Sequence, residues 1–244
     1  YMTLVFMPVP VVSRTPTLTS QQTSLPRPYR QFSRTWIHQK GSKHSMQNKQ
    51  RLILVTGISG SGKSTLARRL ARILILANLD YDVLTEPFLS QIHRQFDPQL
   101  SYGQFCKKWR TESYAVYWGA IAEALAGGAS IVASAPCSEE LTQPHFITDF
   151  RKKHHLPTLS VINLHLVPSV DVLKDHITTR NMERDHHHQT NWEQFQKNIR
   201  QNQPVWDCDA IGTIEYTDSD RILPMSMQFL VTQFLPSEES TSWH

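Results

Sequence analysis

Between residues 51 and 235, short apolar runs of strand length alternate with longer segments in which apolar residues recur every three or four positions. The short runs predict strands at residues 51–56, 81–85, 130–135, 159–167 and 212–217. The longer segments predict helices at residues 64–76, 101–126, 169–184, 192–202 and 223–235. Strands and helices in alternation are typical of a parallel sheet with helices on both faces. The sequence therefore predicts a three-layer α/β domain around a central five-stranded parallel sheet.

The turn between the first strand and the first helix has the sequence "LVTGISGSGKST". Its Gly57 and Gly62 are separated by four residues and followed by Lys63 and Ser64, which matches the phosphate-binding pattern G-x-x-x-x-G-K-[ST] of P-loop NTPases. Glycines let backbone N–H groups converge on an anion, and the helix that follows adds its dipole. We expect Lys63 to reach the β- and γ-phosphates of ATP and Ser64 to ligate Mg²⁺. The residues expected to bind the nucleotide are Gly57, Ser59, Gly60, Ser61, Gly62, Lys63, Ser64 and Thr65.

Acidic residues just beyond the predicted strands are candidates for catalysis, because ligands of parallel sheets bind at the carboxyl ends of the strands. Glu86 directly follows the second predicted strand. After the third strand, where many P-loop enzymes carry an aspartate for Mg²⁺, the sequence has Ser134 and Ala135. Glu86 is therefore the predicted catalytic carboxylate, as general base or linked to the metal, with Glu139 and Glu140 as the next candidates. The alternative for Glu86 is a solvated loop acid or a charge at the N-terminus of a helix.

Two arginines, Arg180 and Arg184, lie four residues apart and hence on one face of a predicted helix. Two guanidinium groups on one face suit the spread charge of a phosphoryl group in transfer, so both are predicted to be catalytic. In the alternative, Glu183 or Asp185 neutralises the pair within the helix. The histidine run at residues 186–188 would point in different directions from a helix end, which favours a solvated lid segment over a metal site.

The phosphate acceptor is expected to lie against the segment between the second and third strands. Arg94 and Arg110 could bind an anionic acceptor there. Trp109, Tyr114 and Tyr117 of the same segment could stack on a ring. For these aromatic side chains we favour the alternative, in which they pack a helix against the sheet.

The phosphate-binding loop, the segment "TTRNMERD" and the following "NWEQF" resemble the small P-loop kinases related to shikimate kinase, gluconate kinase, the zeta toxins and the kinase domain of polynucleotide kinase. The resemblance covers residues 51–235. It implies a helical lid whose Arg180 and Arg184 close over ATP. It also implies that the acid after the second strand, Glu86, serves as base, and that residues 217–221 contact adenine.

These features predict an ATP-dependent phosphotransferase that moves the γ-phosphate to a hydroxyl of a small molecule, a nucleoside or a nucleic-acid end. The "TEP" that contains Glu86 is also similar to deoxynucleoside kinases, but their acid–arginine pair after the third strand has no match in "ASAPCSEE". The alternative is a catalytically silent nucleotide-binding switch or adapter, since the usual third-strand acid is missing. A GTPase would carry N-K-x-D and a motor ATPase a strand ending in Asp-Glu, and the sequence has neither.

The basic character of the chain belongs to its first 50 residues, which contain seven Lys and Arg and no acid. This segment is rich in Ser, Thr and Pro without any sustained period, so we expect a disordered tail before a kinase domain at residues 51–235 and a polar tail at 236–244. The rest of the chain carries 18 Lys and Arg against 21 Asp and Glu, so we expect no stable nucleic-acid binding. The apolar opening at residues 1–12 is too short and too proline-broken to span a bilayer.

The composition of residues 1–45, rich in Arg and Ser and free of acids, is also typical of organelle transit peptides. Alternatively, "GSKHSM" resembles a cloning scar, or Met46 is itself the natural start. The cysteines Cys106, Cys137 and Cys208 form no C-x-x-C pair, which argues against a disulfide framework and a zinc site. We therefore expect a reducing, cytoplasmic location, or an organelle if the transit peptide is genuine.

Overall fold

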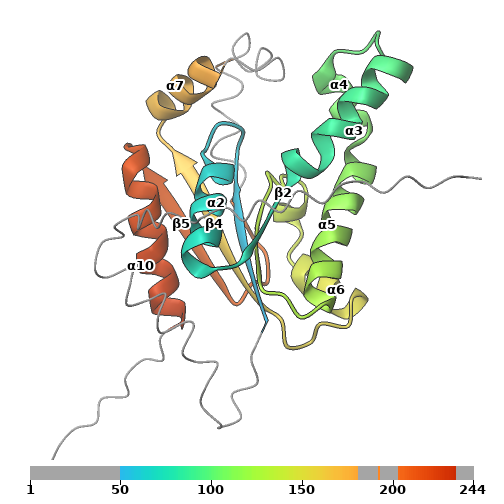
Figure 1. Ribbon diagram of the computed structural model, residues 1–244. Coiled ribbons are helices and arrows are strands. Elements are labelled where there is room, and N and C mark those ends of the chain that lie inside the picture. The colour runs from blue at the N-terminus through green and yellow to red at the C-terminus, as the bar shows by residue number, and fades with distance from the viewer. Residues whose placement is uncertain (1–49, 181–191, 193–202, 235–244) are drawn as a thin grey trace, which may run out of the picture.

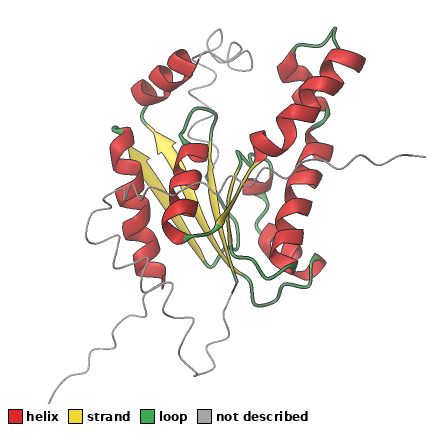
Figure 2. Ribbon diagram, in the orientation of Figure 1, coloured by secondary structure: helices red, strands yellow, loops and turns green. Residues whose placement is uncertain are grey.

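The computed structural model describes residues 50–180, 192 and 203–234, and its strands form one parallel sheet (Figure 1, Figure 2). The strands are β1 (Arg51–Gly57), β2 (Ala77–Asp80), β3 (Ile131–Ser134), β4 (Ser160–Pro168) and β5 (Ala210–Tyr216). They lie in the order β2-β3-β1-β4-β5, with β1 at the centre of the sheet. The predicted five-stranded parallel sheet is confirmed.

Helices cover both faces of the sheet and give the molecule three layers (Figure 1). One face carries α2 (Lys63–Leu74) and α10 (Ile222–Phe234). On the other side lie α3 (Tyr81–Phe96), α4 (Tyr102–Lys108), α5 (Arg110–Ala126) and α6 (Phe146–Lys153). A further helix, α7 (Val170–Arg180), lies beyond the carboxyl end of β4. None of the helices in the described ranges is long and apolar enough to cross a bilayer.

The apolar run of β1 is continuous because both of its faces are buried. Leu52 and Leu54 pack with α5 and α6, whereas Ile53 and Val55 pack with α2 and α10. A strand covered on both sides has no polar face and therefore shows no alternation in sequence. This burial holds the start of the phosphate-binding loop at the centre of the molecule.

The second strand differs from the prediction. It comprises only Ala77–Asp80, and the predicted strand at 81–85 is the first part of helix α3. The side chain of Asp80 caps this helix by accepting a hydrogen bond of 3.2 Å from the amide of Val83. Glu86 therefore lies within a helix rather than just past a strand, and Asp80 is the acid at the carboxyl end of β2.

The predicted helix at 101–126 is divided into α4 and α5 at Trp109. Asp97, at the end of α3, binds both residues at this division: Lys108 at 2.8 Å and the indole nitrogen of Trp109 at 3.3 Å. Helix α6 was not predicted, and two short 3₁₀ turns, η1 (Glu140–Thr142) and η3 (Ser219–Arg221), complete the fold. The predicted helix at 192–202 and both tails lie largely or wholly outside the described residues.

Candidate active site

The loop between β1 and α2 has a backbone that requires glycine. Gly57 has φ +140°, and a Cβ there would lie 2.6 Å from the carbonyl oxygen of Leu166 on β4. Gly60 has φ +83°, and a Cβ there would lie 2.9 Å from side-chain atoms of both Leu173 and Ile177 on α7. A larger residue at either position would push β4 or α7 away from the loop.

The carbonyl groups of the loop are held by side chains from three elements. Lys63 Nζ donates to the carbonyl of Ile58 at 2.7 Å, and Tyr216 Oη at the end of β5 donates to that of Ser61 at 2.8 Å. His176 Nδ1 on α7 donates to the carbonyl of Gly60 at 2.8 Å. Because the peptide unit is planar, each fixed carbonyl also fixes the direction of the N–H that follows it. The loop is therefore preorganised before any phosphate arrives.

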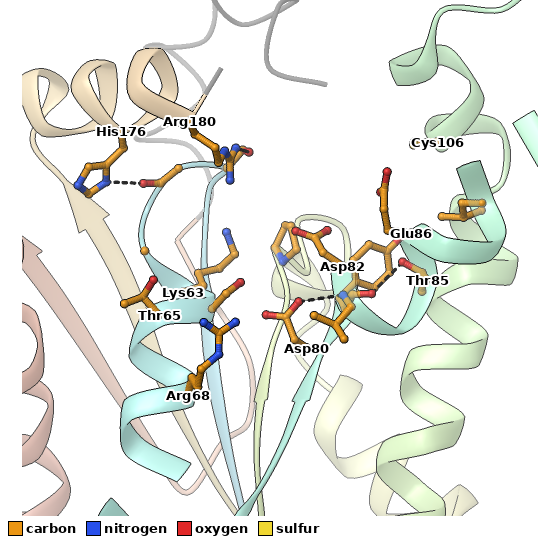
Figure 3. Close-up of a pocket in the computed structure, with 18 of the residues that line it drawn as sticks. Lys63, Thr65, Arg68, Asp80, Asp82, Thr85, Glu86, Cys106, His176 and Arg180 are labelled. Carbon is orange, nitrogen blue, oxygen red and sulfur yellow. Dashed lines mark hydrogen bonds between the residues drawn. The ribbon is translucent and has the colours of Figure 1, made fainter. Parts of the chain in front are cut away.

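A cavity of about 730 Å³ opens between this loop and helices α3 and α4. The loop side carries the cationic side chains of Lys63, Arg68 and Arg180 (Figure 3), together with one acid, Asp175 of α7. Arg180 is near the loop itself, since its guanidinium donates to Ser59 Oγ at 2.9 Å. Of the residues predicted to bind the nucleotide, the cavity is lined by Ser59, Gly60, Gly62, Lys63, Ser64 and Thr65.

The opposite wall of the cavity is acidic. Asp80 lies at its base, and Asp82 and Glu86 face it from α3 (Figure 3). Tyr102 and Cys106 of α4 also line the cavity, and Cys106 lies on the side of Glu86 (Figure 3). Burial and the nearby Cys106 and Glu86 raise the pKa of the Tyr102 hydroxyl, so this group stays uncharged even in basic solution.

Asp80 is a site carboxylate that the sequence analysis did not single out. It is only 5% exposed, and Ser134 Oγ at the end of β3 donates to its Oδ2 at 2.8 Å. Asp80 and Ser134 are register partners, as are Ser134 and Val55 on β1. The edge of the sheet beside the loop therefore has a carboxylate from β2 although β3 ends without one. The two acids of "LDYD" are the sequence signal for this position. A strand of only four residues shows no clear period, so the sequence did not indicate that β2 ends at the first of these acids.

The basic residues considered for an anionic acceptor lie elsewhere. Arg110 pairs with Glu139 at 3.0 Å and with Glu140 at 2.6 Å. Its guanidinium also lies 4.1 Å from the ring centroid of Tyr114. Arg94 bonds to the carbonyl of Ser90 and the side chain of Gln91 on its own helix. Neither arginine lines the cavity, and Tyr114 and Tyr117 pack in the core as the favoured alternative predicted.

The oxygen donors of the site suit Mg²⁺ held together with phosphate. Ser64, Asp80 and Asp82 line the same cavity as the loop, and hydroxyl and carboxylate oxygens are ligands that Mg²⁺ accepts. Within the described part of the chain, no group of His, Cys, Asp or Glu side chains forms a metal site by itself. Such a metal would take most of its ligands from phosphate and water. Arg184 and the histidines at 186–188 lie outside the described residues.

Among solved structures, a protein described as a candidate kinase from Chloroflexus aurantiacus is 19% identical, with a TM-score of 0.58 over 78% of this chain and 100% of that one. A gluconokinase from Sinorhizobium meliloti is 18% identical, with a TM-score of 0.47 over 77% and 95%. A shikimate kinase from Acinetobacter baumannii is 16% identical, with a TM-score of 0.42 over 79% and 98%. The first of these establishes the shared fold.

A comparison with curated proteins finds no match to the chain. A comparison with family models does find one. A family model described as an AAA domain matches residues 52–204, which include the loop, the acidic wall and α7. The chain belongs to this AAA domain family, and its resemblance to the P-loop small-molecule kinases is confirmed at the level of the fold.

Proposed function

We propose that the protein is an ATP- and Mg²⁺-dependent phosphotransferase that moves the γ-phosphate to a hydroxyl of a small molecule, a nucleoside or a nucleic-acid end. The observation that carries the proposal is the division of the cavity: cations of the loop side face three carboxylates, Asp80, Asp82 and Glu86, across one space. Phosphoryl transfer needs both, because the phosphate charge must be stabilised while the hydroxyl loses a proton.

On the donor side, Lys63 and the loop amides would hold the β- and γ-phosphates, and Ser64 would hold Mg²⁺. Bound there, Mg²⁺ would neutralise charge on the phosphate oxygens. Arg180 reaches the loop through Ser59 and would stabilise the charge that spreads over the phosphoryl oxygens in the transition state. We propose the same role for Arg184, four residues further along the sequence.

On the acceptor side, Glu86 remains the proposed general base, now as a cavity-lining residue of α3. Asp82 lies four residues before it in α3, so the two carboxylates share one helix face. Asp80 accepts hydrogen bonds at both oxygens, which fixes its orientation and suits it to holding a metal-bound water beside the loop. The silent nucleotide binder loses its main support, because Asp80 supplies an acid at the edge where β3 has none.

The test measures ADP formation with a panel of hydroxyl acceptors: polyols, nucleosides and oligonucleotide ends. Lys63→Ala should abolish transfer, whereas the melting temperature should fall by a few degrees, since the bond to the carbonyl of Ile58 contributes about 1 kcal/mol. Arg180→Ala should slow transfer by about 10³- to 10⁵-fold and weaken ATP binding much less. Arg94→Ala is the control, because Arg94 does not line the cavity, and its rate of transfer and affinity for ATP should match those of wild type.

Full activity of Lys63→Ala would reject the loop as the donor site. Wild-type protein that binds ATP and forms no ADP with any acceptor would favour the silent nucleotide binder. Unchanged turnover of Arg180→Ala would show that Arg180 does not stabilise the transition state.

A further inference from the structure

Helix α7 lies directly on the phosphate-binding loop. Leu173 and Ile177 are buried, and side-chain atoms of both lie 2.9 Å from the position that a Cβ of Gly60 would take. Two polar side chains of α7, four residues apart, bond to adjacent loop residues: His176 to the carbonyl of Gly60 and Arg180 to Ser59 Oγ. The loop and α7 therefore share both apolar and polar contacts.

His176 also bonds to a second segment. Its Nε2 lies 2.9 Å from Ser219 Oγ in η3, the turn between β5 and α10. The carbonyl of Gly60 can only accept, so Nδ1 carries a hydrogen, and in the neutral ring Nε2 accepts from the Ser219 hydroxyl. One imidazole thus joins the phosphate-binding loop, α7 and η3.

A second, smaller cavity of about 150 Å³ lies next to this imidazole. It is lined by Arg69 of α2 and by Ser219, Asp220 and Ile222. Its lining shares His176, Gly62 and Thr65 with the large cavity. His176 therefore stands where the phosphate side of the site meets the space in front of η3.

We infer that His176 is a positioning residue that couples the nucleoside end of the donor nucleotide to the loop that binds its phosphates. The inference rests on the proposed function, because it requires a nucleoside triphosphate on the loop. A nucleoside that enters the smaller cavity, beside the loop and against η3, would also order Ser219, and Ser219 holds the imidazole that fixes the carbonyl of Gly60. Each end of the nucleotide then stabilises the conformation that the other end needs, which is a coupling free energy between two binding regions.

The test compares ATP with inorganic triphosphate, which has the phosphates but no nucleoside, by calorimetric titration. His176→Asn keeps an amide near the position of Nδ1 but is too short to reach Ser219, and Ser219→Ala removes the other partner. Each should bind inorganic triphosphate within threefold of wild type and ATP about fivefold more weakly, the effect of one neutral hydrogen bond. The double variant should bind ATP no more weakly than either single variant, because both remove the same link.

His176→Leu, which removes both bonds, should weaken the binding of both probes. Thr178→Ala is the matched control on α7, because among the described residues the Thr178 hydroxyl bonds to the carbonyl of Lys174 in its own helix and to neither the loop nor η3. Its affinities should equal those of wild type.

Three results would overturn the inference: ATP losses that multiply in the double variant, equal losses for ATP and triphosphate in Ser219→Ala, or unchanged ATP affinity in His176→Asn. Wild-type protein that binds ATP but no inorganic triphosphate would also overturn it, since the loop would not act as a separate binding region. Wild-type protein that binds neither probe contradicts the proposed function itself. Melting temperatures measured in parallel separate a loss of binding from a loss of folding.

Discussion

Three carboxylates line the acidic wall of the cavity, Asp80, Asp82 and Glu86, and their surroundings differ. Asp80 is buried, and each of its oxygens accepts a hydrogen bond, from Ser134 and from the amide of Val83. Asp82 and Glu86 lie on α3 and face the cavity. A fixed carboxylate suits a constant charge, whereas a base must reach the proton that it accepts. The three residues should therefore respond differently to loss of charge.

Glu86→Gln should lower kcat by about 10²- to 10⁴-fold with little change in ATP affinity, the usual effect of removing a general base. If Glu86 instead holds a metal-bound water, this loss should shrink at high Mg²⁺. Steady-state kinetics over a range of Mg²⁺ concentrations separates the two roles. Asp80→Asn should raise the Mg²⁺ concentration that is needed for half-maximal rate.

Turnover of Glu86→Gln within threefold of wild type at every Mg²⁺ concentration would remove Glu86 from the reaction. Asp82 would then be the next carboxylate to test, because it lines the same cavity. Glu139 and Glu140 are poorer candidates than their place after β3 indicates, since both pair with Arg110.

At the scale of elements, a buried polar cluster joins the two central strands β1 and β4 beneath the loop. Thr56 Oγ1 lies 3.0 Å from His165 Nδ1, and Asn163 Nδ2 donates to Thr56 Oγ1 at 2.9 Å. Burial, with a smaller contribution from the positive charge of Lys63, lowers the pKa of His165 to about 4. The imidazole is therefore neutral in the folded protein at neutral pH.

This cluster predicts acid sensitivity. An unfolded chain binds a proton at His165 near pH 6.5, and the folded protein only near pH 4. The contribution of His165 to stability is thus complete above pH 6.5 and is lost as the pH falls toward 4, by about 3 kcal/mol in total. Denaturant unfolding across this range should show a smaller loss for His165→Gln than for wild type. His145→Gln, at an exposed histidine, should keep the wild-type dependence, and identical curves for all three proteins would contradict the pKa assignment.

Element by element, the sequence predicts what local pattern determines. The strand and helix around the loop, expected at 51–56 and 64–76, lie at Arg51–Gly57 and Lys63–Leu74, because burial on both faces and regular helical spacing are visible in sequence. Strand β2 was misplaced because four residues are too few to show a period, and because the capping of α3 by Asp80 depends on a side-chain bond. The division at Trp109 depends on Asp97, which lies outside the predicted helix.

For the candidate site, the sequence predicts the loop residues and Arg180, whose spacing alone carries the signal. It does not predict Asp80 or His176. Asp80 enters the site through register pairing with β3. His176 enters it through bonds to Gly60 and Ser219, which lie 116 and 43 positions away from it along the chain. Such long-range contacts leave no periodic mark in the chain.

For the whole molecule, the described fold begins at Gln50, whose side chain donates to the carbonyl of Ala129 at 3.1 Å. Removal of residues 1–45 should therefore leave nucleotide binding and melting temperature unchanged, because that segment has no pattern able to bury itself. Titration with ATP and a thermal melt check both. A cut after Leu54 is the contrasting variant and should prevent folding, since it removes half of β1. If the protein without residues 1–45 does not fold, the domain boundary lies within the first 45 residues.

The acidic wall of the cavity follows the edge strand of the sheet that has the shortest pairing. Strand β2 lies at the edge and pairs only with β3, over four residues, and the chain from Tyr81 to Lys108 that bears most of this wall follows it directly. The donor side, by contrast, rests on β1 at the centre. Residues on the acceptor side can therefore diverge without disturbing the nucleotide-binding half. Under the proposed function, such an arrangement would let the phosphate acceptor change through substitutions in a single peripheral segment.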